Sequence, residues 1–462
     1  MSSQEGEQLV IIGGDAAGMS AAMQVRRMRP EQAITVFEEG PTTSYAACGM
    51  PYYVQGLVQK AENLIARRAE VFREKHDIDA RVGHRVEGID IEKKTVRVRD
   101  LETERIFPQA YNRLLVATGA VPLRPGKLPG IGAEGIHTLS ILPDSERIHR
   151  EVEERSPGSA VIIGGGYIGL EMAEALLARG MEVSVVELLP QVMSTLDEDM
   201  AELVGEALKK MGVTLYLGEG VESFETTGGR VTGVKTSRRL LPADLVILAI
   251  GIRPNVALAE EAGIPLGETG AIQVDDRQRT GAPDVWAAGD CVESRHVVTG
   301  GKVFIALGTV ANKQGRIAGI NLGGGEARFP GVAGTAITRV GKTEIARTGL
   351  TVREAGRLEI ETVAAFHEGM TRARYFPEAG PMAVKVVAEK RTGRFLGGQI
   401  VGAAGAGKRI DVFATALHAG LTVAEMRYLD LAYDPPVSPV WDPILGAIGR
   451  AADRVEKQDH PG

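Results

Sequence analysis

One cysteine in a distinctive setting is the first candidate for chemistry in this 462-residue chain. Cys48 lies within Ser44–Tyr53 (SYAACGMPYY), shortly before Pro51, and proline suits the first turn of a helix. A thiol at a helix N-terminus is expected to have its pKa lowered from ~8.5 to ~4–7, which favours the reactive thiolate. No second cysteine is near, so Cys48 is left with three fates: a mixed disulfide, a persulfide or a sulfenic acid. A buried small hydrophobe is the alternative interpretation, and we expect it for Cys291.

Two glycine-rich loops predict dinucleotide binding. Gly164–Gly169 (GGGYIG) is a complete G-x-G-x-x-G between an expected strand and helix, with Glu187 following 187 − 169 = 18 residues later. Such glycines allow a tight turn and close approach to a pyrophosphate, and the acid accepts a hydrogen bond from a ribose hydroxyl. Gly13–Gly18 (GGDAAG) is followed by Glu38 but has Asp15 in place of the second glycine. The negative carboxylate of Asp15 repels a pyrophosphate, unless the Asp15 side chain turns away to cap the helix.

These two loops belong to an internal repeat. Val10–Gly14 (VIIGG) recurs as Val161–Gly165, at an offset of 161 − 10 = 151 residues. Each copy runs from a β-branched strand through the glycines into a helix, and then to a second strand at Ala33–Glu38 or Glu182–Glu187. The repeat therefore predicts two βαβ nucleotide-binding units in an α/β protein.

Two further segments point to a flavin. Thr280–Asp290 (TGAPDVWAAGD) contains an apolar strand that ends in Gly-Asp, which can aim the Asp290 carboxylate at the hydroxyls of a ribityl chain. Together with the first glycine loop and Ala117–Gly119 (ATG), this segment predicts a flavin-binding domain that is interrupted by a nicotinamide-binding domain.

Composition excludes several classes of protein. Fifty-three basic and 60 acidic residues give a net charge of −7, which argues against a nucleic-acid partner. Two cysteines exclude a disulfide scaffold and a cysteine-rich metal site, so we expect no metal. The start of the chain does not resemble a signal peptide, and the longest apolar run, near Leu245–Ile252, is far shorter than the ~20 residues that span a membrane. We expect a cytoplasmic protein with no membrane contact.

The pattern changes after the glycine cluster at Gly323–Gly325, where we expect a domain boundary. Beyond it the sequence predicts strands at Ala383–Ala388 and Leu396–Val401, and a helix from Lys408 to about Ala419. The polar tail Arg454–Gly462 is expected to fray.

On these motifs the chain resembles the pyridine nucleotide–disulfide oxidoreductases, flavoproteins with two dinucleotide-binding domains. It is most similar to the branch of coenzyme A-disulfide reductases, NADH-dependent persulfide reductases and NADH oxidases. Ser44–Tyr52 matches the branch pattern S-x-x-x-C-G-x-P-Y, and Lys408–Val412 (KRIDV) and Ala432–Pro436 (AYDPP) are typical of its C-terminal region. The resemblance extends from Val10 to about Gly449.

The resemblance implies an α/β fold with two Rossmann-like domains and a C-terminal α+β dimerisation domain. The FAD domain is expected in two parts, residues 1–120 and 255–325, with the NAD(P)H domain inserted at 121–254 and the dimerisation domain at 326–462. The implied FAD contacts are Gly13, Gly14, Ala17, Gly18, Glu38, Ala117, Thr118, Gly119 and Asp290. The implied NAD(P)H contacts are Gly164, Gly166, Tyr167, Gly169, Glu171, Glu187 and Gly251.

Within this second set, the resemblance gives Tyr167 the role of covering the flavin until nicotinamide arrives. It makes Glu171 the acid beside the nicotinamide. Leu188 and Leu189 follow Glu187 with no basic residue nearby to hold a 2′-phosphate, so NADH is favoured over NADPH.

The resemblance implies that Cys48 is the redox cysteine of the catalytic site. Tyr375 and Tyr433 match two tyrosines that act across a dimer interface as acids for the leaving thiolate, although Phe376 replaces a further aromatic of the family pattern. Peroxide-reducing relatives carry a histidine where this chain has Ala16, which makes sulfenic-acid chemistry the weaker alternative.

The resemblance also suggests coenzyme A as a substrate component or as an adduct of Cys48. Ser20, Gln24, Arg27 and Ser44 are compatible with the family's contacts. Three other contacts are replaced, by Ala47, His76 and Trp441, which puts coenzyme A disulfide itself in doubt.

The sequence therefore predicts an FAD-dependent NAD(P)H:disulfide oxidoreductase. Its expected substrate is coenzyme A disulfide or a related small disulfide, persulfide or polysulfide, and it is expected to act as a homodimer with composite active sites. Two alternatives stay open: an NADH oxidase that reduces oxygen, and a redox-sensing flavoprotein with little turnover.

Overall fold

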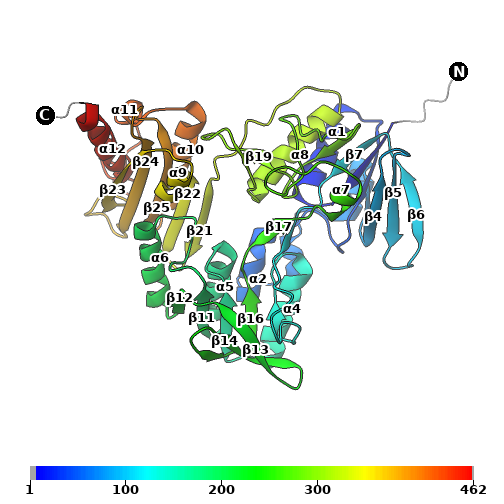
Figure 1. Ribbon diagram of the computed structural model, residues 1–462, viewed down its shortest axis with the longest axis horizontal. Coiled ribbons are helices and arrows are strands. Elements are labelled where there is room, and N and C mark those ends of the chain that lie inside the picture. Colours follow the sequence, from blue (N-terminus) through cyan, green and yellow to red (C-terminus); the bar gives the residue numbers. More distant parts are fainter. Residues whose placement is uncertain (1–6, 460–462) are drawn as a thin grey trace.

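The computed structural model describes residues 7–459, which form three units. The first unit, at the right of Figure 1, is built on a parallel sheet. The sheet has the order β18-β7-β1-β2-β3. Its strands are β1 (Gln8–Ile12), β2 (Ala33–Phe37), β3 (Asp79–Arg81), β7 (Arg113–Val116) and β18 (Val285–Ala287). Successive side chains of a strand face opposite sides of a sheet, so each side needs its own cover.

Helices cover one side of this sheet and a second sheet covers the other. Leu9 and Ile11 pack among residues of α1 (Ala16–Met28), α3 (Ala69–His76) and α8 (Gly308–Leu322). Val10 and Ile12 pack against an antiparallel sheet of β4 (His84–Asp90), β5 (Thr95–Asp100) and β6 (Ile106–Ala110), together with residues around α7 (Ala257–Glu261). The strand within the predicted Thr280–Asp290 segment is β18, at the edge of this same sheet.

The second unit, at the bottom of Figure 1, repeats this plan. Its parallel sheet has the order β12-β11-β10-β16-β9, formed by β9 (Ile136–His137), β10 (Ser159–Ile163), β11 (Glu182–Glu187), β12 (Thr214–Leu217) and β16 (Leu245–Leu248). One side packs on α4 (Leu142–Arg155), α5 (Tyr167–Ala178) and α6 (Glu198–Met211). The other side packs on the hairpin strands β13 (Val221–Thr227), β14 (Arg230–Thr236) and β15 (Leu240–Pro242). The predicted pair of βαβ units is confirmed.

Two adjacent short strands lead into and out of the second unit. β8 (Ala120–Pro122) and β17 (Ile252–Pro254) pair antiparallel, with Val121 opposite Arg253. The second unit is therefore an insertion whose two ends lie side by side. The proposed division of the chain at residues 120, 254 and 325 stays a prediction.

The third unit, at the left of Figure 1, is an antiparallel sheet with helices on one face. The sheet order is β21-β22-β25-β24-β23, with β21 (Ala336–Val340), β22 (Thr343–Gly349), β23 (Thr362–Met370), β24 (Pro381–Glu389) and β25 (Phe395–Gly402). The helices are α9 (Val352–Arg357), α10 (Ile410–Ala419), α11 (Val423–Met426) and α12 (Pro443–Asp459). The two predicted strands and the predicted helix correspond to β24, β25 and α10, which confirms the α+β class of this region.

The expectation that the chain frays from Arg454 is wrong for the residues that the structure describes. Helix α12 continues to Asp459, because Ala447, Ile448, Ala451 and Ala452 are buried against the third sheet. Arg454 also donates a hydrogen bond to the carbonyl oxygen of Ala364 in β23. Residues 460–462 lie outside the described part.

Glycines let α8 approach α1 very closely in the first unit. A Cβ on Gly315 would overlap the carbonyl oxygen of Ala17, and one on Gly319 would lie 2.7 Å from that of Ala21. This contact joins the second part of the first unit to its first part, residues more than 290 positions apart.

We expect Gly315→Ala to lower the free energy of unfolding by about 1–3 kcal/mol, because the added methyl group forces two helices apart. Gly356→Ala on α9 is the matched control, since a Cβ there meets no atom within 4 Å. It should be neutral or stabilising by up to about 1 kcal/mol, because alanine favours helix. Thermal unfolding followed by circular dichroism measures both changes. Equal melting temperatures for the two variants would contradict the packing argument.

Candidate active site between the two nucleotide-binding units

The first glycine loop is held against the end of its own sheet. A Cβ on Gly13 would overlap the carbonyl oxygen of Ala117, and one on Gly18 would overlap that of Gly13, so neither position accepts a side chain. The backbone N–H of Gly14 donates to Glu38 at 2.7 Å, and that of Gly40 donates to the other carboxylate oxygen at 2.8 Å. The loop is thereby fixed at the start of α1, where a helix N-terminus favours a phosphate.

The second glycine loop has the same construction. Gly164 faces the carbonyl oxygen of Ala249, and the N–H of Gly165 donates to Glu187 at 2.7 Å. The position of Gly166 differs: a Cβ there meets no atom within 4 Å. Open space beside the N-terminus of α5 is what a pyrophosphate requires. The residues of this loop therefore fit a dinucleotide. Gly251, also expected to contact NAD(P)H, lies shortly after β16, the strand that pairs with β10.

The third FAD motif reaches the same place as the first two. Gly289 packs on Ala17, at the start of α1, and its N–H donates to Gln314 at 2.9 Å. Next to it, Asp290 has a buried carboxylate oxygen with no hydrogen-bond partner among the described residues. Burial raises the pKa of Asp290 to about 6. A buried acceptor without a donor fits a ligand that supplies a hydroxyl, such as a ribityl chain.

Ala117–Gly119 forms the wall between the first glycine loop and the inserted unit. The N–H of Ala117 donates to Ile12 at 2.8 Å, and the hydroxyl of Thr118 donates to Asn255 at 2.6 Å. Gly119 has a positive φ of 70° and open space where a Cβ would lie. The structure therefore brings together the three segments that the sequence assigned to a flavin.

Asp15 does not cap helix α1 with its side chain, contrary to the condition set out from the sequence. Its carboxylate instead accepts a hydrogen bond from the backbone N–H of Tyr45 at 3.2 Å. Burial, with the nearby charges of Glu38 and Asp290, raises the pKa of Asp15 to about 6. The carboxyl group therefore keeps its proton to a higher pH than an ordinary aspartate, and near pH 6 its repulsion of a phosphate is weakened.

Cys48 lies where the first two units meet. It is exposed and occupies the short 3₁₀ turn Ala47–Gly49 that leads into α2 (Met50–Gln55). Helix α2 belongs to the first unit, but its buried residues Met50 and Val54 join the apolar core of the second unit. The thiol is thereby fixed at the boundary between the two nucleotide-binding sheets. Cys291, in contrast, is fully buried, as expected.

The expected lowering of the Cys48 pKa is wrong for this structure. Burial raises the pKa of the Cys48 thiol, and the negative charges of Glu171, Asp290 and Asp15 raise it further. Helix α2 has only six residues and begins two positions after Cys48, so its dipole is weak at the sulfur. Three carboxylates from distant parts of the chain outweigh it.

Glu171 connects this boundary to the third unit. It lies on α5, and its carboxylate accepts a hydrogen bond from Thr338 of β21 at 2.8 Å. Burial raises the pKa of Glu171, and Glu174 adds to the shift. Glu174 accepts from the N–H of Gly341 at 2.9 Å, so one face of α5 is held by the third sheet. Glu171 is therefore a half-buried carboxyl group of raised pKa, held beside Cys48 by the third unit.

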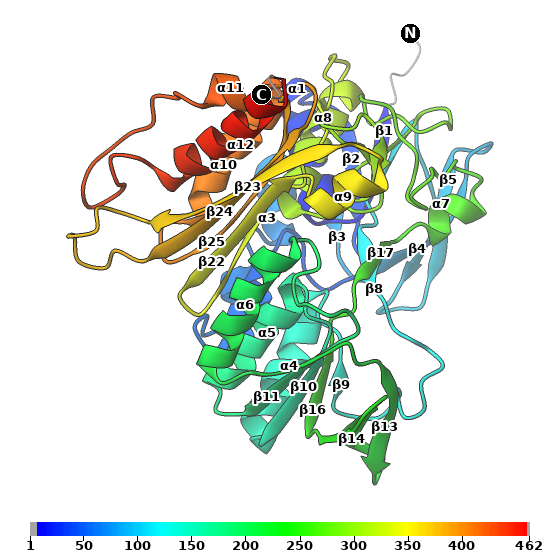
Figure 2. The ribbon, with the colours of Figure 1, turned by 60° about the vertical axis from the view of Figure 1, so that its left-hand side comes forward.

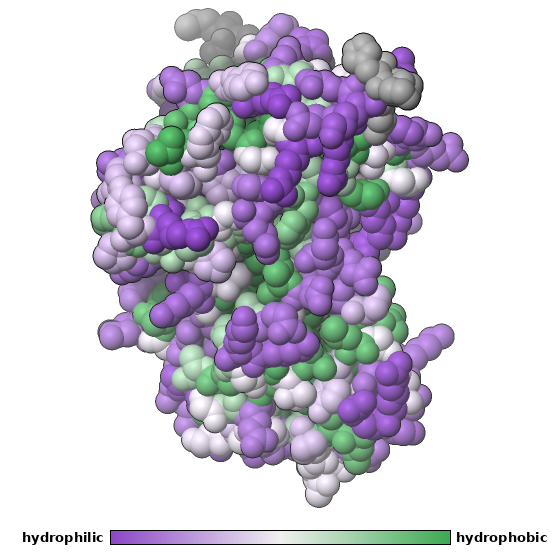
Figure 3. Space-filling view, turned by 90° about the vertical axis from the view of Figure 1, so that its left-hand side faces the viewer, coloured by the Kyte–Doolittle hydropathy of each residue, from purple (hydrophilic) through white to green (hydrophobic). Residues whose placement is uncertain are grey.

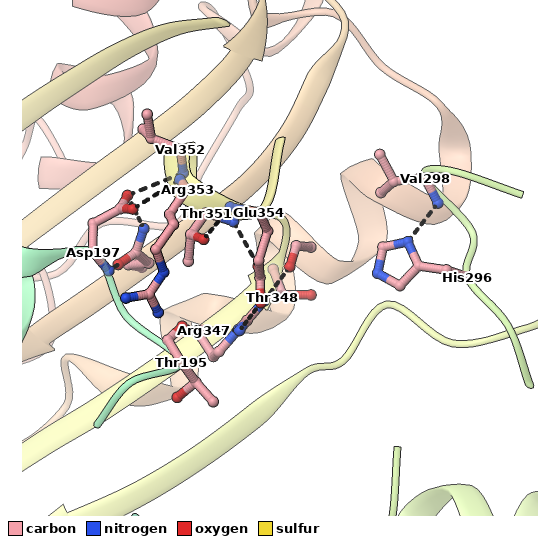
Figure 4. Close-up of polar contacts among 12 residues, drawn as sticks. Thr195, Asp197, His296, Val298, Arg347, Thr348, Thr351, Val352, Arg353 and Glu354 are labelled. Atoms are coloured by element: carbon pink, nitrogen blue, oxygen red, sulfur yellow. Dashed lines mark hydrogen bonds and ion pairs between the residues drawn. The ribbon is translucent and has the colours of Figure 1, made fainter. Parts of the chain in front are cut away.

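An ion pair with a buried arginine fixes the surroundings of Tyr167, and the sequence did not indicate it. Arg347 of β22 pairs with Glu354 of α9 at 2.9 Å and donates to the carbonyl oxygen of Thr195 at 2.8 Å. Figure 4 shows Arg347 between these two partners. Tyr167 begins α5 beside Thr195, and burial raises its pKa. No local pattern marks Arg347, because its partners come from two other segments.

Asp197 anchors the same loop of the second unit. Its backbone N–H donates to Gln399 at 2.8 Å, and its carboxylate accepts from the amide of Gln399 at 2.7 Å and from the N–H of Val352 at 3.3 Å. Lys385 pairs with it at 3.2 Å. Figure 4 includes this contact with α9. The second unit is thus held rigidly against the third.

A cluster of cations lies beside α1, where the resemblance suggested coenzyme A contacts. Arg27 on α1 is near Arg67 and Lys75, and their charges, after burial, lower the pKa of His76. The guanidinium of Arg67 also stacks over Phe72 at 5.3 Å. Arg67 was missed from the sequence, since only the fold brings it to Arg27. Clustered guanidinium groups suit phosphate oxygens.

The other suggested substrate residues are less free. Ser20 donates to Asn312 of α8 at 2.8 Å, and the Cβ of Gln24 lies 2.8 Å from where a Cβ of Gly319 would stand. Ser44 has a positive φ of 49° and donates its N–H to Gly14 at 3.0 Å. Ser44 therefore links the cysteine segment to the first glycine loop. The substrate roles of these residues stay predictions.

Comparison with protein families gives an assignment for most of the chain. Residues 7–317 match the model of the family described as pyridine nucleotide-disulphide oxidoreductase. The chain belongs to this family. Residues 335–443 match the model of its dimerisation domain. The family depends on FAD and uses NAD(P)H, so these are the cofactors of this oxidoreductase.

Individual relatives agree with this family assignment. The chain is 41% identical over 440 residues to the NAD(P)H coenzyme A polysulfide/persulfide reductase of Pyrococcus horikoshii, covering 95% of this chain and 97% of the relative. It is 34% identical over 451 residues to an NADH oxidase of Methanocaldococcus jannaschii, covering 97% and 99%. The solved NAD-dependent persulfide reductase of A. fulgidus superposes with a TM-score of 0.94 at 40% identity, covering 98% of this chain and 84% of that one.

Tyr375 and Tyr433 of this oxidoreductase lie near each other on the third unit, where burial and then the neighbouring Tyr375 raise the pKa of Tyr433. They are 78% and 47% exposed. Their loops, between β23 and β24 and between α11 and α12, project from the same outer edge in Figure 2. Figure 3 shows the side of the molecule at the left of Figure 1, where hydrophilic residues predominate and hydrophobic residues form smaller patches.

We expect Glu171→Gln to lower the pKa of Cys48, because it removes a negative charge that opposes thiolate formation. The variant keeps an acceptor for Thr338. The pH dependence of Cys48 alkylation by iodoacetamide, measured on the FAD-loaded enzyme, reports that pKa. Glu206→Gln on the outer side of α6 is the control and should leave the profile unchanged. An unchanged or raised midpoint in Glu171→Gln would refute the electrostatic argument.

Proposed function

We propose that this chain uses NAD(P)H and FAD to reduce the sulfur–sulfur bond of a coenzyme A-linked persulfide, polysulfide or disulfide through Cys48. One observation carries the proposal: an exposed thiol is fixed between the two nucleotide-binding sheets, with Glu171 of one and Asp290 of the other as its charged neighbours. An electron-accepting thiol needs this position in a chain with two dinucleotide sites.

The roles of the residues follow from their contacts. The two glycine loops, held by Glu38 and Glu187, orient the pyrophosphates of FAD and NAD(P)H. FAD supplies the hydride chemistry when it is bound. The Cys48 thiolate attacks a substrate sulfur, the S–S bond breaks, and one half leaves as a thiolate while the other stays joined to Cys48. Glu171 lies beside the sulfur and sets the charge around it. Two electrons from NAD(P)H then break the bond between Cys48 and the bound half, which is released while the Cys48 thiolate is restored.

Coenzyme A is the carrier that the cation cluster supports best. Arg27, Arg67 and Lys75 can meet phosphate groups, and relatives over 40% identical carry coenzyme A in their names. Oxygen is the second candidate acceptor, supported by the relative named NADH oxidase. Ala16 offers no proton donor in the first glycine loop, which favours sulfur chemistry over oxygen chemistry.

We expect Cys48→Ser to lose at least a hundredfold in kcat/KM for coenzyme A disulfide and for coenzyme A persulfide, because no other exposed thiol can accept the sulfur. NADH should still bleach the flavin absorbance, since neither glycine loop is touched. Disulfide turnover within tenfold of wild type would remove Cys48 from the mechanism. Oxygen consumption without a thiol acceptor measures the oxidase alternative, and a single reduction without steady-state turnover would identify a redox sensor.

The dimer is the second part of the proposal. Tyr375 and Tyr433 are exposed in the single chain. The loop that carries Tyr433 also carries Val437, Val440 and Trp441, which are 67%, 67% and 72% exposed. Exposed aromatic residues on a dimerisation domain are suited to contact a second copy of the chain. We propose that both tyrosines reach the partner's thiol as proton donors.

No helix in residues 7–459 is long and apolar enough to cross a membrane. The cytoplasmic location expected from the sequence stays a prediction.

The composite site has a direct test. Tyr375→Phe/Tyr433→Phe should lose about 10²–10⁴-fold in turnover, the contribution of a general acid, with flavin reduction by NADH unaffected. Tyr433→Phe alone should lose less, because Tyr375 remains. Mixing Cys48→Ser subunits with double-mutant subunits should restore part of the activity, since one intact site then forms per heterodimer. Confirmed subunit exchange without recovery would assign the tyrosines to packing alone.

A further inference from the structure

The turn between β14 and β15 lies next to the end of the coenzyme-binding sheet. Within this turn, the N–H of Ser237 donates to the carbonyl oxygen of Gly220 at 2.8 Å. The hydroxyl of Thr236 donates to Glu219 at 2.8 Å. Gly218–Gly220 follows directly after β12, so the turn is attached to the C-terminal end of that strand.

The same end of β12 is attached to the end of β11. The N–H of Glu219 donates to the carbonyl oxygen of Glu187 at 3.1 Å, and that of Gly218 donates to Leu189 at 2.9 Å. Leu188 lies 3.4 Å from where a Cβ of Gly220 would stand. The turn at residues 236–239 is therefore a neighbour of Glu187–Leu189, although 49 positions separate Glu187 from Thr236 in the sequence.

The two arginines of this turn have different surroundings. Arg239 pairs with Glu219 at 2.9 Å, and its guanidinium stacks over Tyr216 at 4.6 Å. Glu219 is only 2% exposed, so this pair is structural. The guanidinium of Arg238 is exposed and has no ion pair or hydrogen bond with any residue in 7–459. One of its nitrogens lies 3.9 Å from where a Cβ of Gly218 would stand.

This location matters because the adenosine ribose of a dinucleotide lies at the end of the second strand of such a unit. That strand is β11, and Glu187 is its last residue. Both carboxylate oxygens of Glu187 already accept backbone hydrogen bonds, from Gly165 at 2.7 Å and from Leu189 at 2.9 Å. A 2′-phosphate at this place lies beside the negative carboxylate of Glu187, which repels it. Its binding therefore requires a cation nearby.

We propose that Arg238 binds the 2′-phosphate of NADPH, so that this enzyme accepts NADPH as well as NADH. A guanidinium offers paired N–H donors that match phosphate oxygens, and an unpaired one needs no existing contact to break. The inference rests on the proposed use of NAD(P)H. It also replaces the sequence-based reason for favouring NADH, because the basic residue comes from another segment.

Direct binding of nucleotide fragments to the FAD-loaded enzyme tests the assignment without turnover. We expect 2′,5′-ADP to bind by calorimetry, and Arg238→Gln to weaken it about 10–100-fold, the range for hydrogen bonds to a charged group. Binding of 5′-ADP, which has no 2′-phosphate, should change less than twofold. Lys235→Gln, on β14 and paired with Glu222 at 3.4 Å, is the control and should change neither.

Kinetics give an independent measure. Arg238→Gln should lower kcat/KM for NADPH by the same factor, mainly through KM, and leave NADH unchanged. Equal losses for both fragments, no loss for either, or no binding of 2′,5′-ADP to wild type would each overturn the assignment. If the fragments behave as expected while disulfide turnover is absent, the proposed function fails and the role of Arg238 stands.

Discussion

A carboxylate that binds the backbone of a glycine loop is the interaction on which both nucleotide sites depend. Glu38 accepts from Gly14, and Glu187 accepts from Gly165, at the same distance of 2.7 Å. Each bond fixes the loop between two parallel strands, so that the following helix begins directly at the ligand. The glycines make the approach sterically possible, and the carboxylates make it rigid. The two halves of the repeat have kept this construction while their ligands differ.

The reactive region depends on contacts that cross from one unit to another. Helix α2 brings Cys48 from the first unit onto the core of the second, and Thr338 of the third unit holds Glu171 beside it. Arg347 and Asp197 then lock the second unit against the third. The chemistry of the thiol is therefore set by the relative positions of all three units, and a small rotation of one changes its electrostatic environment.

Features of the site that belong to one short segment could be predicted from the sequence, whereas features that depend on contacts between distant segments could not. The glycine loops, their acids and the Cys48 segment could be predicted because each is a short pattern with its own physical requirement. The raised pKa of Cys48 could not be predicted, because Glu171 and Asp290, which contribute to it, are more than 120 residues away in the sequence. Arg67 and Arg347 carry no local signal either, because the fold brings them to Arg27 and to Thr195 from other segments of the chain. Helix α12 extends into the polar tail beyond Arg454 because its apolar side is covered by the third sheet, whose strands come from earlier in the chain.

The pairing of β8 with β17 has a consequence for how such proteins diversify. The coenzyme-binding unit enters and leaves the molecule through two neighbouring strands, with Ile252 opposite Pro122. An insertion with adjacent ends can be exchanged as a cassette without disturbing the host sheet, because the host needs only a short gap closed. Electron-donor preference and electron-acceptor chemistry can therefore evolve separately, by recombination at these two strands as well as by point substitution.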